Sequence, residues 1–160
     1  MFHVVLFQPE IPPNTGNVIR LCANSGCTLH LVRPLGFDIE GKAVRRAGLD
    51  YDELAQVRVH PSLDDCLKEL SGARVFTVET GGTRSYGEVA FEPGDTFVFG
   101  PETRGLPAVV LDKIPADRQI YIPMRPGNRS INLSNTVALV VYEAWRQCAF
   151  AGAEPRSLSD

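Results

Sequence analysis

The chain of 160 residues lacks the features of a secreted, membrane-spanning or metal-stabilised protein. Residues 1–10 have neither a basic start nor a long apolar stretch, so we expect no signal peptide. No apolar run approaches the roughly 18 residues that would span a bilayer. The four cysteines form no CxxC pair and have no histidine nearby at zinc spacing, which favours reduced, structural thiols. We therefore expect a cytoplasmic protein with no metal and no membrane partner.

Positive charge is also scarce. The chain has 16 Lys and Arg residues against 19 Asp and Glu residues, a formal net charge of −3, which is not typical of a nucleic-acid binder. Apolar residues make up 44% of the chain and charged residues 22%, as in globular proteins. This length suits one hydrophobic core. We expect one domain over residues 1–150 and a polar tail over 151–160.

Short β-rich runs alternate with helical patterns. The predicted strands are residues 3–8, 28–33, 57–60, 74–79, 95–100 and 118–123. The predicted helices are residues 15–25, 41–47, 62–70, 107–114 and 132–149. Asn14 or Thr15 can cap the first helix, and Gly26 can end it. Ser62 with Asp65 resembles a capping box. This alternation predicts an α/β fold with a mostly parallel sheet covered by helices on both faces.

The last predicted helix has a wide apolar surface. Seven residues follow one helical stripe: Leu133, Val137, Val140, Val141, Ala144, Trp145 and Cys148. Ala138, Leu139 and Tyr142 extend the apolar surface beyond that stripe. Two interpretations remain open. The helix is either a central core helix, or it covers its own sheet and also meets a partner subunit in a twofold homodimer.

Nucleotide hydrolysis is disfavoured. Residues 36–43 fit a phosphate-binding P-loop in all but the last position, where Ala43 replaces the hydroxyl residue that would hold magnesium. Asp38 and Glu40 would also place two negative charges inside a phosphate cradle. There is no G-x-G-x-x-G after the first predicted strand and no G-x-S-x-G anywhere, so neither a dinucleotide site nor a hydrolase elbow is indicated.

Polar, glycine-containing segments concentrate just after predicted strands. They are residues 12–20, 77–82, 99–105 and 122–135. In parallel α/β sheets, ligands bind outside the carboxyl ends of the strands, where such loops converge. Gly100 and Gly105 permit close backbone approach to a flat ligand. The neutral polar residues near the last segment suit a ligand without a large phosphate charge, and we expect a pocket there.

Three of these segments carry recognisable motifs. Asn14-Thr-Gly-Asn-x-x-Arg20, Phe99-Gly-Pro-Glu-x-x-Gly105 and Ile122-Pro-Met…Ser130-x-Asn132-Leu-Ser-Asn135 resemble the motifs of SPOUT-class RNA methyltransferases. The similarity is greatest to the small TrmL (YibK-like) family of tRNA wobble-nucleotide ribose methyltransferases, over roughly residues 2–150. The resemblance implies methylation of the ribose 2′-hydroxyl of tRNA position 34, a cytidine or modified uridine, by S-adenosylmethionine. It also implies a homodimer and a C-terminal trefoil knot.

The resemblance assigns roles to individual residues. The cofactor-binding residues are Val78, Gly100, Ile122 and Ser130. The reaction-centre residues are Arg20, Glu102, Asn132 and the supporting Asn14. The chain departs from the family at residues 79–81, where Glu-Thr-Gly replaces the frequent hydroxyl residue and lysine. Side-chain contacts to the cofactor at that place are therefore expected to differ.

RNA binding has to coexist with the negative net charge. The candidate substrate-binding residues are Arg20, Arg45, Arg46, Arg104, Arg125 and Arg129, which we expect to follow the anticodon stem-loop of tRNA. Arg20 is either the base that removes the hydroxyl proton, as commonly proposed for the family, or a phosphate anchor, because a guanidinium is a poor base. Two alternatives remain for the whole protein: ribose methylation of another tRNA or rRNA nucleotide, and a non-catalytic RNA-binding module.

Overall fold

The computed structural model describes residues 1–39 and 56–154. Within them, seven parallel strands form one sheet in the order β3-β2-β1-β6-β4-β7-β5. The strands are β1 (His3–Phe7), β2 (Thr28–Val32), β3 (Val57–His60), β4 (Val75–Val78), β5 (Arg84–Ser85), β6 (Thr96–Phe99) and β7 (Gln119–Tyr121). The helices are α1 (Pro12–Ser25), α4 (Leu63–Glu69), α5 (Ala108–Leu111) and α6 (Leu133–Gln147), with 3-10 turns η1 (Tyr86–Glu88) and η2 (Ala116–Arg118). The helix predicted over 41–47 lies outside the described residues.

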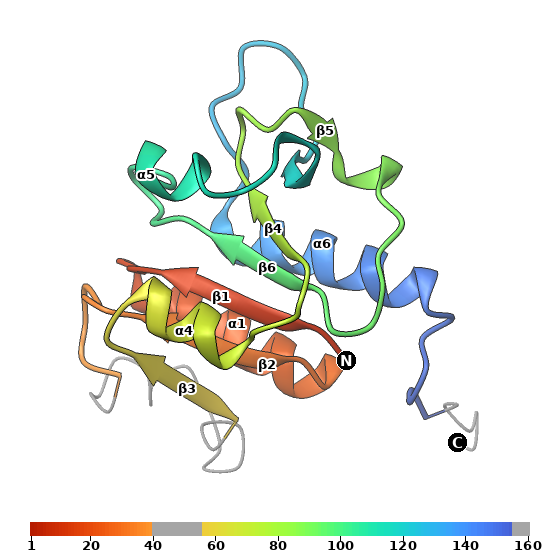
Figure 1. Cartoon of the computed structure of the whole chain (residues 1–160), viewed down its shortest axis with the longest axis horizontal. Helices are drawn as coiled ribbons and strands as arrows, with labels where there is room; N and C mark the ends of the chain where they lie inside the picture. The colour runs from red at the N-terminus through yellow and green to blue at the C-terminus, as the bar shows by residue number, and fades with distance from the viewer. Residues whose placement is uncertain (40–55, 155–160) are drawn as a thin grey trace.

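The helices cover both faces of the sheet. In Figure 1, α4 and α5 lie in front of the strands, and α1 and α6 lie behind them. Two apolar clusters correspond to these two layers, and the one that includes α1 and α6 is the larger. The α/β class, the parallel sheet and its coverage on both faces are therefore confirmed.

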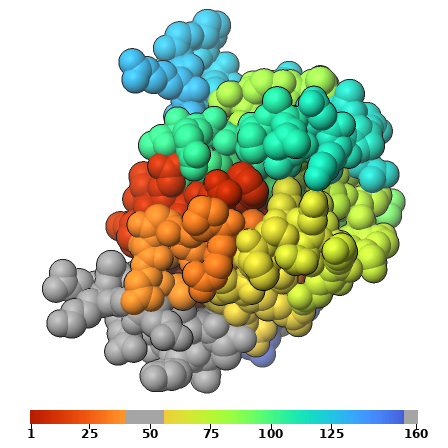
Figure 2. Space-filling view, turned by 60° about the vertical axis from the view of Figure 1, so that its left-hand side comes forward, coloured from red at the N-terminus to blue at the C-terminus, as the bar shows by residue number. Residues whose placement is uncertain are grey.

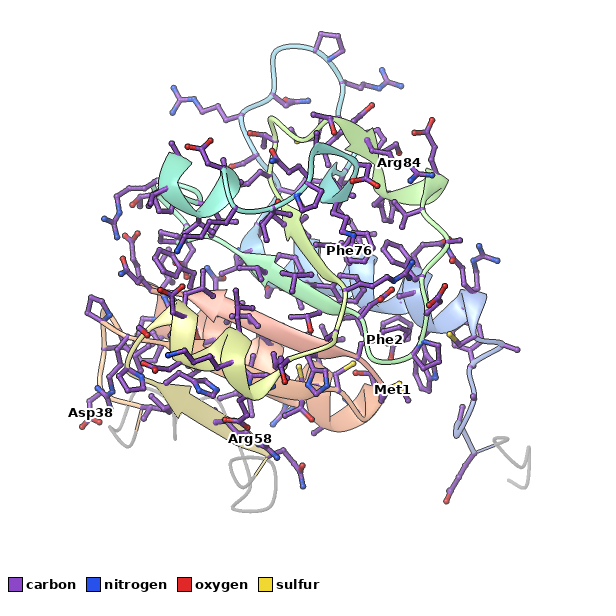
Figure 3. The ribbon with its side chains drawn as sticks, in the orientation of Figure 1. Met1, Phe2, Asp38, Arg58, Phe76 and Arg84 are labelled. Atoms are coloured by element: carbon purple, nitrogen blue, oxygen red, sulfur yellow. The ribbon has the colours of Figure 1, made fainter. Side chains whose placement is uncertain are left out.

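The larger core layer is built on aromatic rings. Phe97 of β6 lies 5.7 Å from the ring of Phe2 and 5.2 Å, edge to face, from that of Phe91. Phe76 of β4 also packs on Phe91, and Figure 3 shows Phe2 and Phe76 among the packed elements. The predicted stripe on α6 closes this layer, since Val137, Val140, Val141, Ala144 and Trp145 are buried. Each pair of tilted or edge-to-face rings adds to the burial of apolar surface.

The start of the first helix differs from the prediction. Neither Asn14 nor Thr15 caps α1, because the helix begins earlier, with Ile11 as the N-cap and prolines in the first turn. Proline suits that position, since its φ is already helical and its missing N–H would have no helical partner. The end is as predicted, with Gly26 at φ +71°. Ser62 caps α4 by accepting a hydrogen bond from the Asp65 backbone N–H at 3.1 Å.

The sequence pattern missed the shortest elements. Two residues of β5, Arg84 and Ser85, pair with β7 and extend the sheet, but a run of two has no readable alternation. Among the described residues the cysteines are free, with Cys22, Cys27 and Cys66 buried. In the described part of the chain, no helix has the length and apolar character needed to cross a membrane.

Candidate active site

A pocket of about 380 Å³ opens at the carboxyl ends of β4, β6 and β7. Its walls are formed by residues 78–80, 99–105 and 129–133, with Ile11, Asn14, Ile122, Met124 and Thr136. The four segments predicted to converge therefore do so. They meet because the sheet order places β4 between β6 and β7, so that the loops following these three strands share one edge.

The two glycines of the second motif serve the fold of their own loop. A Cβ on Gly100 would lie 2.5 Å from the Gly105 carbonyl carbon and from the Leu106 nitrogen. Gly105 itself has φ +68°, a conformation that side chains disfavour. In the structure these glycines let the loop of residues 100–106 close tightly on itself. The close approach of a flat ligand to their backbone stays a prediction.

A chain of hydrogen bonds joins the three motifs. The Glu102 carboxylate accepts the Glu10 N–H at 2.8 Å and the Ile11 N–H at 3.0 Å. Asn14 donates its amide to the same carboxylate at 3.2 Å. The Asn14 side-chain oxygen in turn accepts the Asn132 amide at 2.9 Å. Asn14 is only 6% exposed, so the bonds on both ends of its side chain fix its orientation.

Asn132 also begins the last helix. Its side-chain oxygen accepts backbone N–H groups from Ser134 at 3.0 Å and from Asn135 at 3.3 Å, the arrangement of an N-cap. The Ser134 hydroxyl donates to the same oxygen at 2.7 Å. Asn132 thus ties the start of α6 to Asn14 and, through it, to Glu102.

The predicted arginines are distributed around the pocket. Arg129 lines it, and Arg104 lines it while pairing with Glu10 at 3.6 Å. Arg125 is exposed in the loop between β7 and α6, which projects from the surface in Figure 2. Arg20 is exposed on α1 and is not among the described residues that line the pocket. Arg45 and Arg46 lie outside the described residues.

The resemblance assigns no role to Glu79, a charged residue of the pocket wall. Glu79 follows β4, lines the pocket, and accepts the Leu106 N–H at 2.5 Å. Burial raises the pKa of its carboxyl above the ordinary value, and the bond from Leu106 opposes that rise. The sequence contains two weak indications of a role for Glu79. It is one of the two carboxylates of the motif loops, with Glu102, and it lies where the chain departs from the family pattern.

A second cluster of polar side chains lies beneath α4, away from the pocket. Ligand atoms of His30, His60 and Cys66 lie within 4.8 Å of one another, the one such trio among the described residues. Both nitrogens of His30 already face histidines, His3 at 3.2 Å and His60 at 2.9 Å. Burial raises the pKa of the Cys66 thiol to about 12. The cluster is accounted for by hydrogen bonding among the imidazoles.

Comparison with known proteins identifies the family. Residues 1–142 match the model of the SpoU rRNA Methylase family. The chain belongs to this family. It is 56% identical over 153 residues to the tRNA (cytidine(34)-2′-O)-methyltransferase of Methylovorus glucosotrophus, covering 96% of this chain and 99% of that one. The protein of the same name from Escherichia coli strain K12 is 52% identical over 153 residues, covering 96% and 98%.

A solved structure agrees with the match to the SpoU family. It is described as "Structural insights into the 2-OH methylation of C/U34 on tRNA" and has a TM-score of 0.87 at 46% identity. The alignment covers 94% of this chain and 97% of that one. The resemblance drawn from the three motifs is therefore confirmed, and so is the SPOUT-like α/β architecture.

Proposed function

We propose that this SpoU-family methylase transfers a methyl group from S-adenosylmethionine to the ribose 2′-hydroxyl of tRNA position 34, a cytidine or modified uridine. One observation carries the proposal. The three motif segments meet at one pocket and are hydrogen-bonded to one another, in a chain 56% identical over nearly its full length to a tRNA (cytidine(34)-2′-O)-methyltransferase.

The pocket fits a cofactor of this kind. Its volume of about 380 Å³ falls within the roughly 300–1,000 Å³ of small-molecule sites. Apolar side chains such as Ile122 and Met124 lie beside strand-end backbone and the Ser130 segment, a combination that suits a base and its polar substituents. Val78, Gly100, Ile122 and Ser130 would hold the cofactor, chiefly through backbone groups. When bound, S-adenosylmethionine supplies an electrophilic methyl group on a sulfonium.

The protein's own residues align the reactants. Transfer needs the hydroxyl oxygen held in line with the methyl group and its proton removed. We infer that Asn14, Glu102 and Asn132 keep the motif segments in register at the place where the ribose must enter. Arg20 carries a guanidinium, a group that donates hydrogen bonds, has no acceptor and is a poor base. We propose that Arg20 binds the phosphate next to the reacting ribose, because a guanidinium can donate two parallel hydrogen bonds to a phosphate.

The same proposal includes the wider assembly. Arg104 and Arg129 line the pocket, and Arg125 is exposed in the loop between β7 and α6. These three arginines would contact the anticodon stem-loop, together with Arg45 and Arg46. We infer a homodimer, because α6 exposes Leu139 and Tyr142 on the side away from its buried stripe. We also infer the trefoil knot from the resemblance to the family, and the fact that residues 129–133 and 99–105 line the same pocket supports it. One domain over 1–150, a polar tail over 151–160, no bound metal and a cytoplasmic location complete the proposal.

Radiolabelled methyl transfer to total tRNA, followed by mapping of the labelled nucleotide, tests the activity. We expect a 2′-O-methyl group at position 34. Transfer mapped to another nucleotide would favour the alternative target, and absence of transfer despite bound cofactor would favour an RNA-binding module. The Asn132→Asp variant, which loses the donor to Asn14, should be at least tenfold slower. Asn128→Asp, in the same loop and exposed, serves as the matched control.

A further inference from the structure

Glu79 is a carboxylate built into the pocket wall. Its backbone N–H donates to the Ile120 carbonyl at 3.0 Å, and its own carbonyl accepts the Gly82 N–H at 3.1 Å. These two hydrogen bonds hold the backbone of Glu79 at the junction of β4 and β7, independently of its side chain. The side chain is half-buried and turns toward the loop of residues 100–106.

The carboxyl group sits inside the bend of that loop. One oxygen accepts the Leu106 N–H at 2.5 Å. The same oxygen lies 2.8 Å from where a Cβ of Gly100 would be, and the other oxygen lies 2.8 Å from the corresponding point on Gly105. Two glycines thus make room for this carboxyl, and a side chain at either would displace it. The position of the charge is set by the fold of the loop.

The charge of Glu79 has little compensation from the protein. Glu102, the other acid of the motif loops, receives three N–H donors, and Glu10 pairs with Arg104. Among the described residues, Glu79 is in no ion pair, and its carboxylate accepts one hydrogen bond, from the Leu106 N–H. A half-buried carboxylate in this state gains from any positive charge brought into the same cavity.

We propose that Glu79 makes the pocket selective for a cationic ligand, so that S-adenosylmethionine binds more tightly than S-adenosylhomocysteine. The inference rests on the proposed function. In the transfer, a bond forms between the ribose oxygen and the methyl carbon, and the carbon–sulfur bond breaks with its electron pair returning to sulfur. The hydroxyl proton leaves to solvent or a base. The cofactor thereby loses one positive charge, and with it the attraction of Glu79, which favours release of the spent product.

The expected size follows from Coulomb's law. Two unit charges about 8 Å apart, at an effective dielectric constant of about 20–40, attract strongly enough to change an affinity on the order of 5- to 30-fold. The effect should belong to the charge of Glu79 and not to its hydrogen bond, because glutamine keeps an oxygen that can accept from Leu106.

The test is calorimetric titration of the full chain with S-adenosylmethionine, S-adenosylhomocysteine and sinefungin, whose amine replaces the methyl-sulfonium with another positive charge. Wild type should prefer both cationic ligands to S-adenosylhomocysteine. Glu79→Gln should weaken the two cationic ligands about 5- to 30-fold and S-adenosylhomocysteine less than 2-fold. Glu88→Gln, an exposed acid of η1, removes the same charge far from the wall and should change none of the three affinities.

Each other outcome is decisive. Equal weakening of all three ligands by Glu79→Gln would make the residue a structural brace and overturn the proposal. Glu79→Asp, which keeps the charge on a shorter side chain, should retain the preference for cationic ligands. If neither variant folds, equal wild-type affinity for the three ligands overturns the proposal by itself. Wild type that binds none of them would instead remove the proposed function, so the two failures are distinguishable.

Discussion

Hydrogen bonds to Glu102 show that residues chosen for their chemistry also organise the backbone. Its carboxylate accepts the backbone N–H groups of Glu10 and of the N-cap Ile11, the two residues just before α1. It also takes the Asn14 amide. A carboxylate is suited to this place because both of its oxygens accept and neither donates. Glu102 of the second motif therefore holds the first motif in place through these hydrogen bonds.

Replacing the Glu102 carboxylate with an amide should lower both stability and activity. In Glu102→Gln one acceptor becomes an NH₂ group that faces N–H donors, so at least one donor is left unpaired. We expect the free energy of unfolding to fall by about 1–3 kcal/mol and kcat to fall at least tenfold. Urea unfolding and methyl-transfer kinetics measure the two effects. Glu88→Gln is the control, and a Glu102→Gln variant as stable as that control would refute the linking role.

Adjacent strands carry a row of imidazoles across one face of the sheet. His30 on β2 lies opposite Val5 of β1, and His60 on β3 lies opposite Val32 of β2, so the rings step diagonally beneath α4. Successive ring centroids are 5.3 and 5.1 Å apart. The row ends near Glu69, whose carboxylate lies 3.7 Å from the His60 ring. Each contact in the row joins a donor nitrogen on one ring to an acceptor nitrogen on the next.

The row of histidines makes the stability of the fold depend on pH. Burial, with smaller contributions from His3 and His60, lowers the pKa of His30 to about 4, against about 6.5 in the unfolded chain. Between these values the unfolded state binds more protons, so the contribution of His30 to stability is full above pH 6.5 and falls toward pH 4, by about 3 kcal/mol. Burial lowers the pKa of His3 in the same direction, while Glu69 opposes the effect and Arg58 reinforces it.

Urea unfolding between pH 4 and 8 measures this loss. The His30→Gln variant removes the proton site and should flatten the curve over the acidic half of that range. Asp64→Asn, an exposed acid of α4, is the control and should leave the slope between pH 5 and 6.5 unchanged. If His30→Gln had the same slope as wild type, the acid sensitivity would belong to other groups.

The pocket and the exposed apolar residues of α6 lie on different parts of the molecule. Its pocket lies at the carboxyl ends of the central strands, and α6 runs along the back of the sheet (Figure 1). That helix buries one stripe and leaves Leu139 41% and Tyr142 43% exposed. Tyr142 packs edge to face on Trp145 at 5.6 Å, so the exposed ring is held in one place. Aromatic side chains such as that of Tyr142 are enriched in contacts between subunits, which supports the proposed homodimer.

Negative charges on the exposed face of α6 should separate the subunits of the proposed homodimer. The double variant Leu139→Glu, Tyr142→Glu would bury two carboxylates in the proposed dimer contact, which is strongly unfavourable. Light scattering after size-exclusion chromatography should give a monomer, with methyl transfer to tRNA reduced at least tenfold. Val109→Glu changes an apolar residue of α5 that is 64% exposed and should remain dimeric. A double variant that stays dimeric would place the interface elsewhere.

The sequence by itself determined the local structure and the chemistry of the loops. Alternating and helical periods predicted β1, β2, β3, β4, β6 and β7 and the long helix α6 nearly to their ends, because these depend on neighbours in sequence. The resemblance to the family also grouped Asn14, Glu102 and Asn132 as reaction-centre residues. The start of α1 was predicted wrongly, because the helix begins at two prolines ahead of the expected cap.

Only the tertiary structure decided how those residues act on one another. Glu102 bonds to Asn14 across 88 residues and Asn132 to Asn14 across 118, distances that no local spacing encodes. Strand order placed β4 between β6 and β7, which brought Glu79 beneath Gly105 and left Arg20 outside the described pocket lining. A hydrogen bond or a burial cost depends on which strands are neighbours, and that is settled when the whole sheet packs.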